Sequence, residues 1–149
     1  MTLMKFCELK ADIWQFYNSG EFVVIATNGF IKRNGEAVMG RGIAKQAKDR
    51  FPGIAYAVGK AITKNGNVPM VNIEYRIITL PTKVMWTEPG SLPLIEASLK
   101  TLVKITNELG LTAVYLPRPG CGNGNLDWLT QVKPLCEQYL DERFHICNQ

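Results

Sequence analysis

The chain contains Gly120-Cys121-Gly122-Asn123-Gly124, a run with three glycines in five residues. The apolar run at 112–117 before it is typical of a buried strand, and Leu126-Asp127-Trp128 indicates that a helix begins after it. Glycines at such a turn leave backbone N–H groups uncovered, so a phosphate can approach them closely. The segment predicts a strand–loop–helix unit with an anion-binding loop, although glycine also occurs in such turns for steric reasons alone.

A second loop of the same kind lies earlier in the chain, at Met39-Gly40-Arg41-Gly42. We expect a helix from Ile43 to Phe51 directly after it, ended by Pro52-Gly53. The positive end of that helix dipole would favour an anion. Arg41 either adds positive charge to this site or is a solvated surface side chain.

The other expected elements alternate between strand and helix. Strands are expected at residues 22–26, 71–73, 75–80, 112–116 and 144–147, and helices at residues 43–51, 54–63, 92–109 and 127–140. The clearest is the helix at 92–109, whose apolar residues recur at helical spacing between an N-cap at Ser91 and an end at Gly110. This alternation predicts an α/β fold whose sheet is covered on both faces.

Several polar or glycine-rich positions follow the predicted strands. They are Asn28, the Gly40 loop, Lys83 and the Gly120 loop. Ligands of open α/β sheets bind at the carboxyl ends of the strands. We therefore expect one cleft to collect all four.

Three candidate site residues each have two interpretations. The Asn28 amide suits a ribose hydroxyl, but Asn-Gly is also a strong turn dipeptide. Lys83 is either a surface lysine or an amine that attacks a sugar C1 carbon and forms a Schiff base, which requires a lowered pKa. Asp12 either accepts a hydrogen bond from an exocyclic amine, such as that of adenine, or caps a helix.

Length and composition favour one domain, residues 1–149, with 46% hydrophobic and 20% charged residues. No apolar run is long enough to cross a membrane, and Met1–Glu8 lacks the apolar core of a secretory signal. The net charge of +4 is compatible with an anionic small ligand or with nucleic acid.

The four cysteines have no redox or zinc spacing, and the chain has one histidine. We expect free thiols in a reducing cytoplasm, with no metal and no cofactor. Cys121 is better explained as a small apolar residue that packs the loop than as a nucleophile, because the one imidazole, His145, lies far along the chain. Among acids near the loops, Glu36 and Glu88 are expected to be solvated, and Asp127 to cap a helix.

Together these segments resemble the macrodomain family, an α/β/α module that binds ADP-ribose. The resemblance runs from about Asp12 to Phe144 and is carried by Asp12-Ile13, by residues 24–28, by residues 39–44 and by residues 116–124. It implies a three-layer α/β/α fold with a central mixed sheet. Leu80-Pro81-Thr82-Lys83, with Trp86 nearby, resembles the branch with a catalytic lysine, which includes DNA ADP-ribosyl glycohydrolase antitoxins.

The resemblance also implies a role for each matching residue. Asp12 and the Ile13 backbone would bind adenine, and Asn28 would hold the distal ribose. Gly40, Arg41 and Gly42 would line the diphosphate and distal ribose. The second loop, Gly120, Cys121, Gly122, Asn123 and Gly124, would wrap the diphosphate through backbone N–H groups. Lys83 would attack the anomeric carbon of the distal ribose and release the modified group.

The chain departs from the family pattern at two positions. Protein-directed glycohydrolases of this branch carry an aspartate in the second loop where Gly124 stands here, and many macrodomains have a smaller residue at the position of Arg41. The lysine mechanism without that aspartate fits better. We therefore expect a monomeric hydrolase, without membrane association, that removes ADP-ribose from a macromolecule, with DNA favoured over protein.

Three alternatives remain at this point. The first is a phosphatase acting on ADP-ribose 1″-phosphate. The second is a module that reads or sequesters ADP-ribose, or a derived nucleotide, without chemistry. The third is that both glycine loops are purely structural and that the resemblance to the macrodomain family is wrong.

Overall fold

The computed structural model describes residues 5–149, so Met1–Met4, part of the segment assessed for a secretory signal, lie outside it. In chain order the elements are β1 (Cys7–Lys10), α1 (Ile13–Asn18), β2 (Phe22–Asn28), α2 (Gly42–Arg50), α3 (Ile54–Asn65), β3 (Val71–Asn72), β4 (Ile77–Lys83), α4 (Leu92–Leu109), β5 (Val114–Leu116), η1 (Trp128–Val132), α5 (Lys133–Tyr139) and β6 (Phe144–Asn148). No helix among residues 5–149 combines the length and apolarity needed to cross a membrane.

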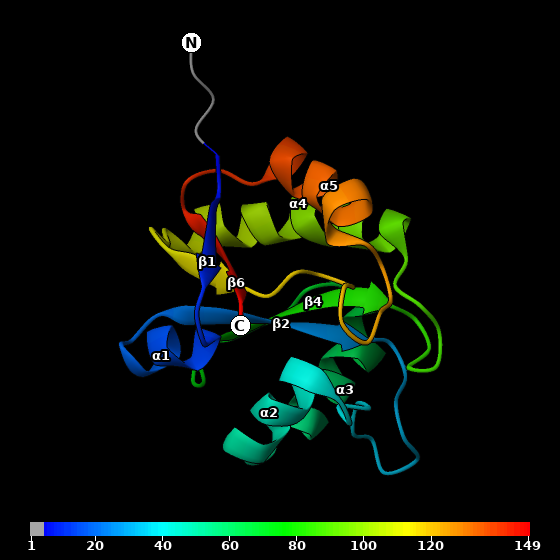
Figure 1. The fold of residues 1–149 in the computed structure, drawn as a ribbon. Coiled ribbons are helices and arrows are strands. Elements are labelled where there is room, and N and C mark those ends of the chain that lie inside the picture. Colours follow the sequence, from blue (N-terminus) through cyan, green and yellow to red (C-terminus); the bar gives the residue numbers. More distant parts are fainter. Residues whose placement is uncertain (1–4) are drawn as a thin grey trace.

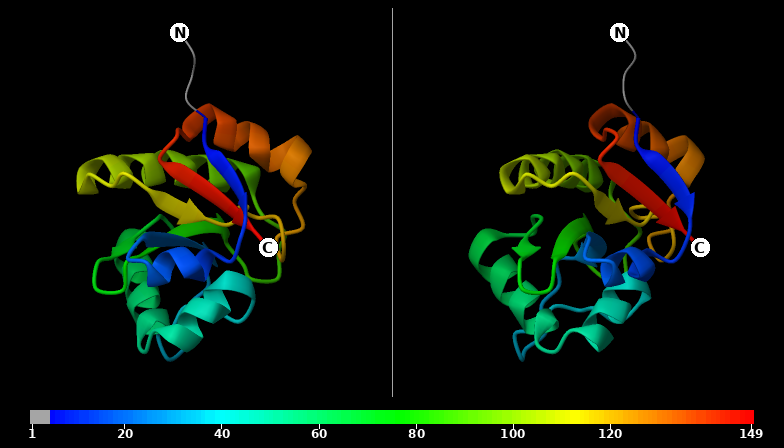
Figure 2. Two further views of the ribbon diagram at one scale, coloured as in Figure 1. Left: turned by 60° about the vertical axis from the view of Figure 1, so that its left-hand side comes forward. Right: turned by 90° about the vertical axis from the view of Figure 1, so that its left-hand side faces the viewer.

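The strands form one mixed sheet in the order β1-β6-β5-β2-β4-β3. All neighbouring strands pair in parallel except β3, which runs antiparallel to β4. The carboxyl ends of the five parallel strands therefore lie along one edge of the sheet. In both views of Figure 2, β1 and β6 run side by side, at the end of the sheet remote from β3.

Helices cover both faces of the sheet, as expected for a three-layer α/β/α fold (Figure 1). One apolar cluster packs α4, η1 and α5 against the sheet, and a second packs α1, α2 and α3 against the opposite face. The central strand β2 contributes Val24 to the first cluster and Val23 and Ile25 to the second, and none of the three is exposed to solvent. This burial on both faces explains why β2 is a continuous apolar run rather than an alternating one.

Two elements near the N-terminus are not among the strands and helices expected from the sequence, although a helix cap is one of the two interpretations of Asp12. β1 is mostly exposed and has no apolar pattern, and it forms by parallel pairing with β6 at the far end of the chain. α1 is a six-residue helix capped by Asp12, whose Oδ1 accepts from the Trp14 N–H at 3.1 Å. The strand expected at 75–80 begins only at Ile77, because Arg76 is in the left-handed region with φ of 53°.

The helix expected at 127–140 is split. It begins as the π-helical turn η1 and continues as α5, with the Lys133 N–H donating to the carbonyl of Trp128. Pro134 lies in the first turn of α5 and has no N–H to donate to the preceding turn. Asp127 caps η1 as expected, because its Oδ2 accepts from the Thr130 N–H at 2.9 Å.

The pairing of β2 with β4 contains a bulge at its carboxyl end. Thr27 pairs with Pro81, but Asn28 pairs with Lys83, so Thr82 is an extra residue in β4. The Thr82 hydroxyl donates to the carbonyl of Thr27 at 3.3 Å. Bulges change the direction in which the following side chain points, and this one places Lys83 beside Asn28.

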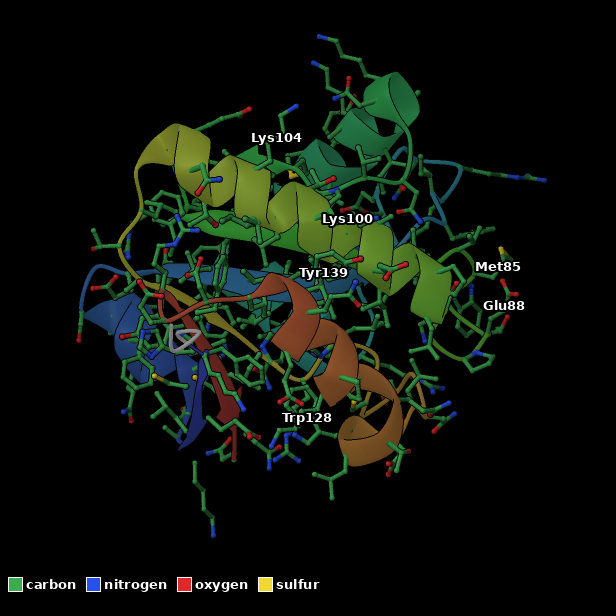
Figure 3. All side chains as sticks on the ribbon, turned by 90° about the horizontal axis from the view of Figure 1, so that it is seen from above. Met85, Glu88, Lys100, Lys104, Trp128 and Tyr139 are labelled. Carbon is green, nitrogen blue, oxygen red and sulfur yellow. The ribbon has the colours of Figure 1, made fainter. Side chains whose placement is uncertain are left out.

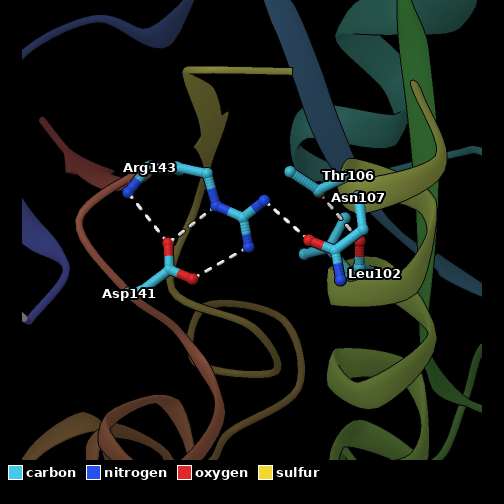
Figure 4. A network of polar contacts seen from close by, with 5 residues as sticks. All are labelled: Leu102, Thr106, Asn107, Asp141 and Arg143. Atoms are coloured by element: carbon cyan, nitrogen blue, oxygen red, sulfur yellow. Dashed lines mark hydrogen bonds and ion pairs between the residues drawn. The ribbon is translucent and has the colours of Figure 1, made fainter. Parts of the chain in front are cut away.

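A polar tether joins the start of β6 to the end of α4 (Figure 4). The Arg143 guanidinium donates to both carboxylate oxygens of Asp141, at 2.9 and 2.8 Å, and to Asn107 Oδ1 at 2.7 Å. Because β6 begins at Phe144, this tether lies at the amino end of a parallel strand, away from the edge where the strands end.

Candidate functional site

A cavity of about 610 Å³ opens at the carboxyl ends of β2, β4 and β5. Its size is that of a small-molecule or cofactor site. The sequence-predicted residues that line it are Asn28, Gly40, Arg41, Gly42, Lys83, Gly120, Cys121, Gly122, Asn123 and Gly124. The structure thus brings both glycine loops, Asn28 and Lys83 into one cleft.

The two glycine loops meet at the start of α2. Gly42, the first residue of α2, has φ of 58°, a conformation that L side chains rarely adopt. A Cβ atom there would approach Asn123 Nδ2 to 2.9 Å. The backbone of the first loop therefore packs directly against the Asn123 side chain of the second loop, and both loops line the cavity.

The second loop is closed by its own backbone. The N–H groups of Cys121, Asn125 and Leu126 donate to carbonyls within residues 118–122. A Cβ atom on Gly124 would clash with the carbonyl of Gly120, whereas one on Gly122 would meet open space. In the described part of the chain, this closure does not use the N–H groups of Gly120 and of residues 122–124, which leaves them for a ligand.

Lys83 is the last residue of β4 and lines the cavity. Its Nζ lies 3.5 Å from the backbone oxygen of Asn123, to which it donates a weak hydrogen bond. Partial burial, and then the positive charge of Arg41, lower the pKa of the Lys83 amine below its ordinary value. A lowered pKa raises the fraction of free amine, the form in which lysine is a nucleophile.

Asn28 lines the cavity but uses its amide within the protein. Its Oδ1 accepts from the Phe30 N–H at 3.0 Å, and its Nδ2 donates to the carbonyl of Val38 at 3.0 Å. The side chain therefore organises the loop between β2 and α2. Its contact with a ribose stays a prediction.

Asp12 and Ile13 lie outside the lining of this cavity. Asp12 follows β1, at the same edge of the sheet but four strands away from β4, and its Oδ1 caps α1. Ile13 is buried in the core on the α1 face. The adenine contact assigned to this pair stays a prediction.

All charged side chains in the lining are cationic. They are Lys32, Arg41, Lys83 and Arg118. The acids Glu36, Glu88 and Asp127 are absent from the lining, so the described cavity has no carboxylate for general acid or base chemistry. Its charge suits an anionic ligand.

Arg118 was not singled out from the sequence, although it stands two residues before the second glycine loop. Its Nη2 lies 3.8 Å from Glu8 Oε1, and its guanidinium lies 5.1 Å from the centroid of the Trp128 ring. Trp128 Nε1 and Lys133 both donate to the Glu8 carboxylate, and the Lys133 hydrogen bond is the largest of the effects that hold the pKa of Glu8 below its ordinary value. Glu8 and Trp128 thereby hold Arg118 against the cavity.

Cys121 lines the cavity and also packs against the apolar core. Burial raises the pKa of its thiol to about 11. The thiolate is therefore scarce at neutral pH, which agrees with a packing role and argues against a nucleophile.

The fold and the cavity can be compared with known proteins. The chain is 36% identical to a curated DNA ADP-ribosyl glycohydrolase of Mycobacterium tuberculosis, over 75% of this chain and 35% of that protein. It is 34% identical to the DNA ADP-ribosyl glycohydrolase of Thermus aquaticus, over 72% of this chain and 32% of that protein. The chain thus spans about a third of the length of these curated relatives. No protein-family model matches it.

A comparison with solved structures finds a similar protein over nearly the whole chain. The macrodomain of Mycobacterium tuberculosis DarG matches with a TM-score of 0.77 and 28% identity, covering 98% of this chain and 99% of that structure. The chain belongs to the macrodomain family. Within that family it is similar to the macrodomain of DarG and to the DNA ADP-ribosyl glycohydrolases.

Proposed function

We propose that this macrodomain binds ADP-ribose and hydrolyses its bond to a DNA base, with Lys83 as the nucleophile. The observation that carries the proposal is the position of Lys83. Its amine lines a cationic cavity and lies against a loop whose free N–H groups suit a diphosphate. The names of the curated relatives support DNA as the carrier of the modification.

The reaction begins with the free amine of Lys83. Its lone pair forms a bond to C1″ of the distal ribose and the bond from C1″ to the modified base breaks. The base leaves with the proton that the attacking amine loses once its nitrogen is bonded to C1″. The ribose ring then opens to give a Schiff base on Lys83. One water molecule hydrolyses this intermediate, which returns the amine and releases ADP-ribose.

The surrounding residues hold and activate the reactants. Arg41 and Arg118 would neutralise the diphosphate, and the N–H groups of residues 122–124 would bind its oxygens. Partial burial of Lys83 keeps part of the amine unprotonated. The clash of a Cβ on Gly124 with Gly120 supports a mechanism without a loop aspartate at this position.

The test uses the purified protein and its Lys83→Ala variant. Each is incubated with ADP-ribosylated single-stranded DNA and with an ADP-ribosylated protein, and free ADP-ribose is followed by mass spectrometry. Release from DNA that disappears in the variant is the expected result.

Two other results would replace the proposal with one of the alternatives. No release from either substrate, with tight ADP-ribose binding in calorimetry, would indicate a binding module. Release of inorganic phosphate from ADP-ribose 1″-phosphate by both proteins would indicate the phosphatase.

We also propose that the protein acts as a monomer in the cytoplasm. All four cysteines are free thiols in the structure, which supports a reducing compartment. Sedimentation of the purified protein at several concentrations tests the monomer.

A further inference from the structure

Two exposed aromatic side chains stand at the mouth of the cavity. Phe30 and Trp86 both line it, yet they are 36% and 43% exposed. The other tryptophans, Trp14 and Trp128, are buried at 3% and 6%. Aromatic faces that remain open beside a ligand site are available to stack on a planar group.

The backbone that carries these two aromatic residues is held in place. The Phe30 N–H donates to Asn28 Oδ1 and its carbonyl accepts from the Val38 N–H at 3.1 Å. The Gly29 N–H donates to the carbonyl of Val84 at 2.8 Å, which joins the loop after β2 to the loop after β4. Phe30 and Trp86 thus lie on two loops that are fixed to each other, so little ordering is needed before they bind.

With the adenine at Asp12, as predicted, Trp86 would lie on the leaving-group side of the reaction. Asp12 follows β1 and Lys83 ends β4, four strands away along the same edge, about 19 Å at the usual strand spacing. A ligand with its adenine near Asp12 and its distal ribose at Lys83 therefore directs the modified group past Lys83. The loop after β4, which contains Trp86, begins at that point.

The charges at this mouth suit a nucleic-acid backbone. Lys32 lies in the same loop as Phe30, is exposed, and lines the cavity. The acids of the two loops are engaged locally: Glu88 Oε1 accepts from the Met85 N–H, and Glu36 Oε1 accepts from Asn34 Nδ2. Figure 3 shows Met85 and Glu88 pointing outward from the loop before α4.

We propose that Trp86 and Phe30 stack on the bases that flank the modified nucleotide in single-stranded DNA, with Lys32 on the adjoining phosphate. This inference rests on the proposed function and specifies its substrate as a strand rather than a single nucleotide. Stacking needs bases that are not already paired and stacked in a duplex, so the surface selects single strands.

The first test follows tryptophan fluorescence, because Trp86 is the one tryptophan that solvent reaches. An unmodified single strand of about ten nucleotides is titrated at low salt, and quenching by neutral acrylamide is measured. We expect the strand to protect the accessible emission in the wild type, and no such protection in Trp86→Phe, whose remaining tryptophans are buried. If a saturating concentration of the strand leaves acrylamide quenching of the wild-type tryptophan fluorescence unchanged, the proposal is overturned.

The second test compares two substrates that carry the same modified base. One is the ADP-ribosylated nucleoside, and the other is the same nucleoside within a single strand. The readout is the ratio of their kcat/KM values. We expect Trp86→Ala to lower the strand-to-nucleoside ratio about tenfold or more, the size of one lost base stack, and Trp86→Phe to retain most of it.

Met85→Ala is the matched control, because Met85 is an exposed apolar side chain of the same loop that lies outside the cavity lining. It should keep the wild-type ratio. If Met85→Ala lowers the strand-to-nucleoside ratio of kcat/KM as much as Trp86→Ala does, the substitutions disturb the loop in general. That result would overturn the assignment to Trp86.

The two proposals fail in different ways. If the proposed function is wrong, neither substrate releases ADP-ribose. If only the stacking surface is wrong, both substrates are hydrolysed and Trp86→Ala leaves their ratio unchanged. The stacking proposal would also be overturned if an ADP-ribosylated protein were hydrolysed faster than the strand and Trp86→Ala left that rate unchanged.

Discussion

The Nζ atom of Lys83 lies 3.5 Å from the backbone oxygen of Asn123, so the end of β4 contacts the second glycine loop across the cavity. A ligand diphosphate bound by the N–H groups of that loop would lie next to the amine. The loop would thus fix both the phosphate and the distance from the ribose to Lys83.

Substitution of Lys83 separates chemistry from binding. We expect Lys83→Ala to reduce release of ADP-ribose at least about 10³-fold, because the nucleophile is lost. Affinity for ADP-ribose should stay within about threefold, since backbone N–H groups hold the diphosphate. Lys100→Ala, on the outer surface of α4 (Figure 3), is the control and should match the wild type.

Arg41 should contribute, after burial, to the pH at which the proposed hydrolysis begins. The pKa of Lys83 is lowered by burial and by the charge of Arg41, and only the free amine reacts, so kcat rises with pH to a plateau above that pKa. Without Arg41 the pKa moves back toward 10.5, and the rise in kcat should shift to higher pH in Arg41→Ala. Arg33→Ala, an exposed residue outside the lining, should keep the wild-type profile. An unshifted profile in Arg41→Ala would contradict the assigned cause.

Substitution of two glycines of the second loop should have different effects, one on ligand binding and the other on stability. A side chain at Gly122 would enter the open space of the cavity, so Gly122→Val should preserve the melting temperature and abolish ADP-ribose binding in calorimetry. A side chain at Gly124 would clash with Gly120, so Gly124→Ala should lower the free energy of unfolding by about 1–3 kcal/mol. Tight binding by Gly122→Val would show that the ligand lies elsewhere.

The Asp141–Arg143 pair should affect stability and leave activity unchanged. The Arg143 hydrogen bonds hold the pKa of Asp141 below its ordinary value of 3.8, so the carboxylate stabilises the fold above that value and this contribution is lost as pH falls through the lowered pKa. At neutral pH, Asp141→Asn should reduce the free energy of unfolding by about 1 kcal/mol. Denaturant titrations should show this difference shrinking below about pH 3.8. An equal loss of unfolding free energy at neutral and at acidic pH would contradict an electrostatic origin.

Much of the fold was predictable because its signals are local. The helix at 92–109 has a complete apolar stripe with a cap at each end, and its observed bounds agree with the expected ones. β1 was missed because its four residues are mostly exposed and its existence depends on pairing with β6, which no local pattern encodes.

The candidate site was predictable to a similar extent. The glycine loops and Lys83 follow strands, so topology alone brings them to one edge of the sheet. Phe30 and Lys32 had no signal, because their place in the lining depends on how Asn28 folds the loop after β2. The lowered pKa of Lys83 also depends on burial and on Arg41, neither of which spacing along the chain reveals.

The extra residue Thr82 has a consequence for how such macrodomains are compared and redesigned. In a regular strand, deletion or insertion of one residue turns each following side chain to the opposite face of the sheet. A relative could keep the Pro-Thr-Lys tripeptide, lack the bulge, and direct the amine into the core instead of the cleft. A relative therefore needs the same strand register as well as the same residue for its lysine to reach the cleft. An alignment that places a gap beside Thr82 would misjudge which relatives have a lysine in that position.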